Sequence, residues 1–247
     1  MIYQSRDYRK FMQSGRFDSF IVKYKEIDLW IGVSRGAISE KLKEFALEKI
    51  KKLRDELDEY IKHNSFFLTS LETIKPNDDM PSSVKEMCEI SEKTGIGPMS
   101  AVAGYFAEFI GKEIKKRFKL DEIVIENGGD IFLDIIESLT ITIYAGDSPL
   151  SEKVGINIDC KFSPLGISTS SGTVGHSLSF GKADAVMIAC KNSALADSFA
   201  TKFCNAIKSV DDIDSVLKLT KEYSDIISAV IIYGEKIGVR GKFDVEF

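Results

Sequence analysis

The sequence predicts an α+β fold, in which antiparallel or mixed sheets pack against helices. Apolar and polar residues alternate in several short segments, as half-buried strands require. Longer segments carry apolar residues at every third or fourth position, which indicates amphipathic helices. Strands and helices follow one another in blocks, and this order favours α+β over a doubly wound parallel sheet.

Chain length and charge limit the organisation and the partners. At 247 residues the chain is long for one core and short for two full domains, so we expect a single domain over 1–247. It could have two lobes, at about 1–120 and 121–247. The net charge of -5 provides no general basic field, so we expect neither nucleic acid nor an anionic membrane as a partner.

The opening segment, "MIYQSRDYRKFMQSGRF", lacks the apolar centre of a signal peptide. No later run approaches the roughly 18 apolar residues of a membrane span. We therefore expect a cytoplasmic protein. The 4 cysteines lie far apart, which favours buried, reduced thiols over a zinc site or a redox dithiol.

The first half of the chain is predicted to form a hairpin and three helices. The segment "FDSFIVKYKEIDLWIGVS" alternates on both sides of a polar centre at Lys25 and Glu26, which is typical of a β-hairpin. A long amphipathic helix over Ile38–Lys62 follows, and "KPNDDMPSS" separates it from a helix near Val84–Lys93. Pro98 suits the first turn of the third helix, in "GPMSAVAGYFAEFIGKEIKKRF".

One face of this third helix carries only small residues, which form a ridge beside its core stripe. The ridge consists of Ser100, Gly104, Ala107 and Gly111. Without large side chains, it lets another segment approach closely. The ridge therefore predicts close packing, by another element of the chain or by another protein.

The second half begins with strands and continues with a long polar run. The expected strands are Ile123–Glu126, Ile131–Ile135, Thr140–Ala145 and Val154–Cys160. The polar run starts at Gly166 and is predicted as a long loop, after which "ADAVMIAC" reads as a strand buried on both faces. Helices near Ser193–Lys208 and Ile213–Glu222 follow, and then a closing hairpin around Gly234 and Glu235.

Two glycine-rich segments could hold a ligand. In "TGIGPMSAVAG", glycines and Pro98 come before a helix whose free N–H groups suit a phosphate. In "IVIENGGDIFLDI", a glycine pair joins two strands and would let a flat ligand approach the backbone. As patterns alone, the first favours helix capping with close packing, and the second favours a plain hairpin turn.

The polar run and the helix after it supply hydroxyl groups and a carboxylate. The run from Ser168 to Thr173 offers donors suited to a phosphate or a ribose, and His176 could act as acid, base or ligand. Asp197 and Thr201 are spaced i, i+4, so their oxygens project side by side, which suits a hard cation such as Mg²⁺. By pattern alone, a structural histidine and a solvated polar face are the favoured interpretations.

Together these segments resemble the ApbE superfamily, the flavin transferases that attach FMN from FAD to a protein threonine in a Mg²⁺-dependent reaction. "NGGD" matches the family's GGD turn, "STSSG" looks like its TSG segment, and "SALADSFAT" is similar to its AMLADALAT-like helix. "GPMSAVAGY" occupies the position of its DPGGIAKGY-like stretch, and the four segments occur in the same order. The resemblance covers about Gly95–Ser209, and the whole chain looks like a short, uncharacterised cytoplasmic branch of the superfamily.

The resemblance implies an ApbE-like α+β fold with a site for FAD and Mg²⁺. Asp197 and Thr201 would be the metal ligands, with a backbone carbonyl near Val102 as a third. His176 or Asp130 would move a proton. The residues implied to bind the flavin nucleotide are Gly97, Pro98, Ser100, Asn127, Gly128, Gly129, Thr169, Ser170, Ser171 and Gly172.

The chain also departs from the family pattern in ways that bear on catalysis. Gly97 stands where the family stretch begins with Asp, and Ala103 stands where it carries Lys before GY. "HSLSFG" replaces the HIIDP segment, and only His176 matches it. Loss of the Lys removes a charge that could hold phosphate or a developing negative charge.

The resemblance implies a flavin-nucleotide binding protein. If it is active, it would transfer FMN to a threonine of an acceptor protein or hydrolyse FAD to FMN and AMP. The first alternative is a binding module that holds a nucleotide or another small anion without turnover. The second is a structural assembly partner that keeps only the scaffold and forms a homo-oligomer.

Overall fold

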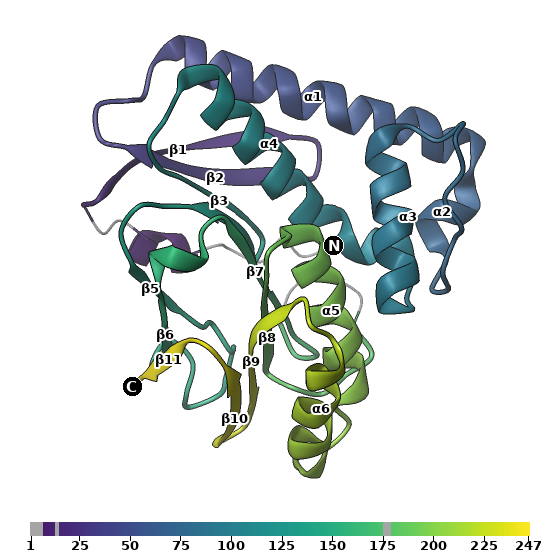
Figure 1. Ribbon diagram of the computed structural model, residues 1–247, viewed down its shortest axis with the longest axis vertical. Helices are drawn as coiled ribbons and strands as arrows, with labels where there is room; N and C mark the ends of the chain where they lie inside the picture. The colour runs from purple at the N-terminus through teal and green to yellow at the C-terminus, as the bar shows by residue number, and fades with distance from the viewer. Residues whose placement is uncertain (1–6, 13–14, 175–178) are drawn as a thin grey trace.

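The computed structural model describes residues 7–12, 15–174 and 179–247, and a long antiparallel sheet forms its centre (Figure 1). The strands of this sheet are β1 (Phe17–Tyr24), β2 (Ile27–Ser34), β3 (Ile123–Asn127), β4 (Asp130–Asp134), β7 (Leu165–Ser170), β8 (Ala185–Cys190), β9 (Ile226–Tyr233) and β10 (Lys236–Gly241). They lie in the order β1-β2-β3-β4-β7-β8-β9-β10. Every neighbouring pair is antiparallel.

Helices cover one face of this sheet (Figure 1). They are α1 (Glu40–His63), α2 (Ser65–Thr69), α3 (Ser82–Thr94), α4 (Val102–Phe118), α5 (Ser193–Ala206) and α6 (Ile213–Leu219). Short 3-10 turns are η1 (Asp7–Met12), η2 (Pro98–Ala101), η3 (Cys160–Phe162), η4 (Val210–Asp212) and η5 (Thr220–Glu222). Helix α4 packs on β3 and β4, α5 on β7 and β8, and α3 packs in turn against α5.

A small second sheet lies against the opposite face. It contains β5 (Leu139–Thr142), β6 (Gly155–Ile158) and β11 (Asp244–Glu246), in the antiparallel order β11-β6-β5. Side chains from both sheets, among them Ile156, Leu165 and Met187, form one buried cluster. The main sheet is therefore a middle layer, with helices on one side and the small sheet on the other.

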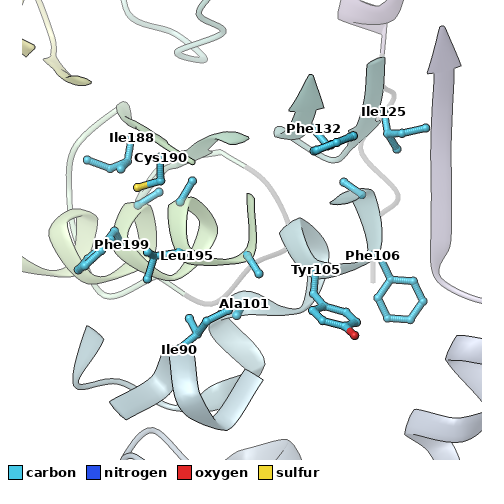
Figure 2. Packing of buried hydrophobic residues seen from close by; sticks show 14 of the residues in the cluster. Ile90, Ala101, Tyr105, Phe106, Ile125, Phe132, Ile188, Cys190, Leu195 and Phe199 are labelled. Carbon is cyan, nitrogen blue, oxygen red and sulfur yellow. The ribbon is translucent and has the colours of Figure 1, made fainter. Parts of the chain in front are cut away.

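The larger core lies between the main sheet and the helices, and α5 runs through its centre. Figure 2 shows Ile188 and Cys190 of β8 on one side of α5, while Leu195 of α5 faces Ile90 of α3 on the other side. Because α5 is covered on both sides, nearly all of its side chains are small or apolar. Full burial of each large apolar side chain stabilises the fold by about 1.5–3 kcal/mol.

The predicted α+β architecture is confirmed, and most elements lie close to their predicted positions. The hairpin turns at Lys25, whose φ is 52°, and the closing hairpin turns at Gly234, whose φ is 57°. The Pro98 segment begins with a 3-10 turn, η2, before α4. Local periodicity and turn chemistry were sufficient to predict these elements.

The prediction of a long loop starting at Gly166 is wrong for the first part of the polar run. Residues Leu165–Ser170 form β7, which pairs with both β4 and β8. The side chains on one face of β7 are small because α5 lies close, and a Cβ at Gly166 would lie 2.1 Å from Cα of Ser193. Because α5 packs so closely on β7, this inner strand consists of small and polar residues that are otherwise typical of a loop.

The small-residue ridge packs within the chain. A Cβ at Gly104 would lie 2.2 Å from the carbonyl oxygen of Ser193, and one at Gly111 would meet the ring of Phe132 at 2.4 Å. The hydroxyl groups of Ser100 and Ser198 are 2.8 Å apart. The segments that approach this ridge are therefore α5 and β4, so the ridge is not free for another protein.

Three further expectations concern the organisation of the chain. The predicted lobes share the main sheet, since β2 of the first pairs with β3 of the second, and their division stays a prediction. All four cysteines are free, and Cys88, Cys190 and Cys204 are buried. Within the described residues, no helix combines the length and the apolar character that crossing a membrane requires.

Substituting Gly104→Ala should destabilise the fold, although alanine is the better helix former. Helix propensity alone would stabilise the variant by about 1 kcal/mol. The added Cβ would instead collide with backbone atoms of Ser193, so we expect a net loss of about 1–3 kcal/mol. Urea unfolding measures this change, with Lys116→Ala, at an exposed position of α4, as the control. A Gly104→Ala variant as stable as the parent would contradict the close packing of α4 on α5.

Candidate functional site

Four segments that were predicted to form the site meet at the start of α4. The Asn127 side chain donates a hydrogen bond of 3.1 Å to the carbonyl of Ala103, and Asp197 Oδ2 accepts one of 2.9 Å from the N–H of Gly104. These two groups belong to the same peptide unit. The N–H of Thr169 donates to the carbonyl of Gly129 at 3.2 Å, which joins the end of β7 to the NGGD turn. The structure thus brings these four segments together.

Strand alternation separates the predicted residues of β7 onto two faces of the sheet. Ser168 pairs with Ile188 and Ser170 with Val186, whose side chains lie in the core on the helix side. Thr169 lies between them and shares its face with Leu165 and Ile167, which belong to the core between the two sheets. Successive side chains of a strand point to opposite faces. Thr169 therefore points away from α5.

Asp130 lies on the helix side of the main sheet, opposite Ser168. It pairs with Ser168 in the register of β4 and β7, and it is buried. Phe132, two residues further along β4, is part of the core on the helix side. The predicted proton-transfer residue is thus next to β7 and on the same face as α5.

Hydrogen bonds hold the end of β7 and the segment after it in place. Ser170 and Ser179 hydrogen-bond the Cys204 thiol and oppose the rise in its pKa that burial causes. The Ser171 hydroxyl accepts bonds from two backbone N–H groups, those of Thr173 at 3.0 Å and Val174 at 2.9 Å. A Cβ at Gly172 would lie 2.2 Å from the carbonyl of Gly181, although the residue itself is exposed. Gly172 and Thr173 are exposed and Ser171 is partly exposed, so these three residues are the accessible part of this segment.

The Gly97 segment serves packing and capping. Gly97 and Pro98 are buried, and a Cβ at Gly97 would lie 1.9 Å from the carbonyl of Ser70. The Ser100 hydroxyl donates to the carbonyl of Gly97 at 2.7 Å and also contacts Ser198. The first free N–H groups of α4 point to Asp197. A direct contact of Gly97, Pro98 or Ser100 with a ligand stays a prediction.

Asp197 is a partly buried carboxylate whose surroundings favour its neutral form. Burial raises its pKa to about 7, while hydrogen bonds from the backbone N–H groups of Gly104 and Ala103 oppose the rise. None of the ion pairs among the described residues involves Asp197. A bound cation would therefore stabilise the charged form of Asp197.

Thr201 lies one turn after Asp197 on α5 and is also partly buried. Within the part of the chain that the structure describes, the Thr201 hydroxyl has no hydrogen-bond partner. Among the same residues, no group of three or more His, Cys, Asp or Glu side chains could hold a metal. A desolvated carboxylate beside an available hydroxyl fits Mg²⁺, which usually keeps several waters or phosphate oxygens as ligands. The residues present thus fit a cation whose remaining ligands would be waters or phosphate oxygens.

Some predicted features lie outside this site. His176 falls outside the described residues, so its role stays a prediction. Two surface hollows, one between α3 and the start of α5 and the other between α1 and the end of α4, are not lined by the predicted residues.

Two features of the site are absent from the ligand-binding residues that the resemblance implied. The first is Ser168, which the run of hydroxyl donors did include; it is fully buried, and among the described residues its Oγ has no hydrogen-bond partner. Alternation along β7 would have placed Ser168 rather than Thr169 on the helix side, once the segment was known to be a strand. The second is a buried ion-pair cluster of Arg9, Asp28 and Glu126 beside the NGGD turn. The available signal was Asp28, the one charged residue in the mostly buried strand β2.

Comparisons with known proteins cover most of the chain. A family model described as "AbpE bacteria" matches residues 9–232. A UPF0280 protein of Methanocaldococcus jannaschii is 39% identical over 202 residues, which cover 80% of this chain and 81% of that protein.

Solved structures share the fold at low sequence identity. The ApbE protein of Thermotoga maritima superposes with a TM-score of 0.63 at 14% identity, over 91% of this chain and 97% of that one. The flavinyl transferase ApbE of Pseudomonas stutzeri, in its apo form, gives 0.57 at 13% identity, over 91% and 93%. The ApbE-like fold is thereby confirmed.

Substituting Ser168→Ala should leave the free energy of unfolding unchanged or increase it. A buried hydroxyl without a partner costs about 1–3 kcal/mol, and alanine removes it without enlarging the side chain. The matched control is Ser198→Ala, because Ser198 is equally buried but bonds Thr94 and Ser100 at 2.8 Å. We expect the control to lose about 1 kcal/mol in urea unfolding. Equal losses in both variants would mean that Ser168 has a protein partner.

The contribution of Asp197 to the stability of the ligand-free protein should fall as the pH rises from about 4 to 7. Asp197 is ionised above about pH 4 in the unfolded chain, but its pKa is about 7 in the folded chain. Between these values the folded state binds a proton that the unfolded state lacks, so raising the pH favours unfolding, by at most about 4 kcal/mol. Urea unfolding at several pH values measures how the free energy of unfolding depends on pH. Between pH 4 and 7 this free energy should fall less, or rise more, in Asp197→Asn than in the parent. Equal slopes in the two proteins would contradict the raised pKa.

Proposed function

Because the chain belongs to the family described as "AbpE bacteria", we propose that it binds FAD and Mg²⁺ where α5, the NGGD turn and the end of β7 meet. One observation carries the proposal: the partly buried Asp197, without an ion-pair partner among the described residues, lies one turn from the available hydroxyl of Thr201. The similarity of the fold to ApbE structures supports it.

Each group of the site would have a separate task. Asp197 and Thr201 would hold Mg²⁺, which would neutralise the diphosphate of FAD and polarise it for attack. Exposed backbone at Gly128 and Gly172 lets the flat or anionic parts of a nucleotide approach closely. Asp130, buried beside Ser168, would accept a proton from the attacking group.

Two reactions are compatible with these tasks. In the first, a threonine hydroxyl of an acceptor protein attacks the diphosphate, so that FMN becomes attached to the threonine and AMP leaves. In the second, water attacks, and FAD yields FMN and AMP. His176 is a further predicted acid or base for either reaction. A cytoplasmic location and a homo-oligomeric state also stay predictions.

A nucleotide-binding module without turnover is the second candidate function, and position 103 favours it. Ala103 stands in the first turn of α4, and its carbonyl is bound by Asn127. The methyl group cannot supply the positive charge of the lysine in the related family pattern. Packing of the small-residue ridge within the chain removes the main argument for a purely structural partner.

Incubation with FAD and Mg²⁺ tests the proposal, with FAD, FMN and AMP separated by chromatography. We expect AMP release that chelation of Mg²⁺ abolishes and that Asp197→Asn reduces by at least about 100-fold, as loss of a charged ligand at the diphosphate should. The matched control is Asp214→Asn, at an exposed position of α6, which should keep the parental rate. Mg²⁺-dependent binding of intact FAD without AMP would support the binding module, and no binding at all would refute both functions.

A further inference from the structure

A short N-terminal turn inserts a buried arginine beside the NGGD turn. Arg9, in η1, is 7% exposed and lies against two buried acidic residues. Its Nη1 donates to Asp28 Oδ1 at 2.6 Å, and its Nε donates to Glu126 Oε2 at 2.6 Å. A third bond, of 2.7 Å, runs from Nη2 to the backbone carbonyl of Asp28. The planar guanidinium thus joins β2 and β3 at their ends near the turn.

The carboxylate of Glu126 connects this arginine to the turn itself. While Oε2 is bound by Arg9, Oε1 accepts a bond of 2.9 Å from the N–H of Gly129 and one of 2.8 Å from the hydroxyl of Tyr8. Gly128 and Gly129 have φ values of 70° and 106°, so the turn has little intrinsic preference for one conformation. The bond to Glu126 restrains the turn, and it does so from the face of the main sheet that points away from the helices.

The position of Glu126 depends on Arg9, because a buried carboxylate is retained only with a partner. Glu126 is 1% exposed and Asp28 is 4% exposed. Burial disfavours the charge on Arg9, but the two carboxylates outweigh this and raise its pKa. Without Arg9, Asp28 would keep Lys23 at 3.0 Å, but Glu126 would lose the one ion-pair partner that it has among the described residues. The buried Glu126 would then have to become protonated or move towards water. Either change would weaken the acceptor of the Gly129 N–H.

We propose that Arg9 is a positioning residue that orders the Gly128–Gly129 turn through Glu126, and thereby prepares the turn for its ligand. The ligand part of this inference rests on the proposed function. Since Asn127 binds Ala103 on the helix side, the turn is held from both faces of the sheet. Anchoring of the N-terminal segment and ligand binding at the turn are therefore coupled.

Hydrogen exchange of the Gly129 amide, followed by NMR without ligand, tests the positioning role. In Arg9→Met, exchange at Gly129 should become about tenfold faster, as loss of one hydrogen bond implies. The Glu235 amide, in the β9–β10 turn, should keep its rate. Unchanged exchange at Gly129, or an equal increase at Glu235, would overturn the inference.

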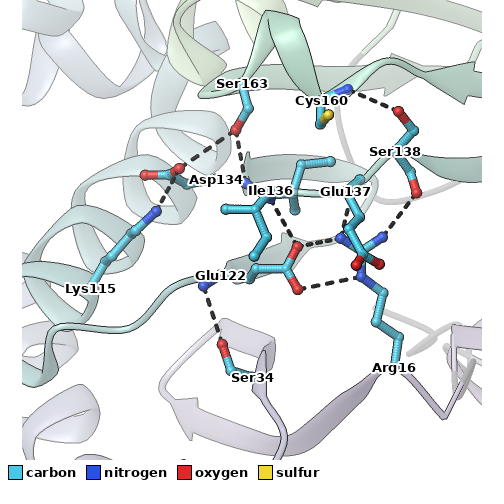
Figure 3. A network of polar contacts seen from close by, with 11 residues as sticks. Arg16, Ser34, Lys115, Glu122, Asp134, Ile136, Glu137, Ser138, Cys160 and Ser163 are labelled. Atoms are coloured by element: carbon cyan, nitrogen blue, oxygen red, sulfur yellow. Dashed lines mark hydrogen bonds and ion pairs between the residues drawn. The ribbon is translucent and has the colours of Figure 1, made fainter.

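The matched control is Arg16→Met. Figure 3 shows that Arg16 binds Glu122, just before β3, and the carbonyls of Glu137 and Ser138. This is also an arginine from near the N-terminus paired with a glutamate, but it lies at the far end of β3 from the turn. Arg16→Met should therefore leave exchange at Gly129 unchanged, and faster exchange there would overturn the inference.

FAD titration of the folded variants tests the coupling to the ligand. Arg9→Met should weaken binding about tenfold relative to the parent, and Arg16→Met should bind as the parent does. If Arg9→Met does not fold, Arg9→Lys replaces it in both measurements, because lysine keeps the charge but cannot reproduce the fork of three bonds. Parental affinity in the Arg9 variant would overturn the coupling. If the parent itself binds no FAD, the proposed function fails, and the exchange result alone decides the role of Arg9.

Discussion

A single peptide unit at the start of α4 connects the candidate site to the rest of the molecule. The carbonyl of Ala103 accepts a bond from Asn127, and the N–H of Gly104 donates one to Asp197. The bond to Asp197 requires α5 to lie very close to α4, and only a residue without a side chain allows this, since a Cβ at Gly104 would meet the carbonyl of Ser193. The packing of the two helices and the position of Asp197 beside this peptide unit therefore depend on the same glycine.

This close approach also explains why structural and functional interpretations of the site were hard to separate. Where α5 crosses β7, Gly166, Ser168 and Ser170 are on the helix side, and each is small enough to pass beneath the helix. Small polar residues are equally the residues that leave backbone and hydroxyl groups available to a nucleotide. Burial distinguishes the two roles: Gly97 and Pro98 are covered by the chain, whereas Gly128 and Gly172 are exposed.

The NGGD turn is restrained from both faces of the main sheet by different kinds of interaction. On the helix side, Asn127 makes a hydrogen bond to the backbone of α4. On the other side, Glu126 bonds the turn and is itself held by a buried arginine. A buried ion-pair cluster contributes little to net stability, because desolvation of the charges offsets their attraction. Its specific geometry nevertheless restrains a glycine pair that would otherwise be free to adopt many conformations.

The sequence by itself determined the α+β class, the positions of most helices and strands, and the resemblance that pointed to the fold. These follow from periodicity, turn residues and short motifs, which are properties of neighbouring residues. The tertiary structure decided that the start of the polar run is a central strand, that Ser168 rather than Thr169 faces α5, and that Arg9 lies beside Glu126. The face of a strand residue depends on register, since a shift by one residue exchanges the faces. The contact of Arg9 with Glu126, 117 residues further along the chain, exists only once the sheet is assembled.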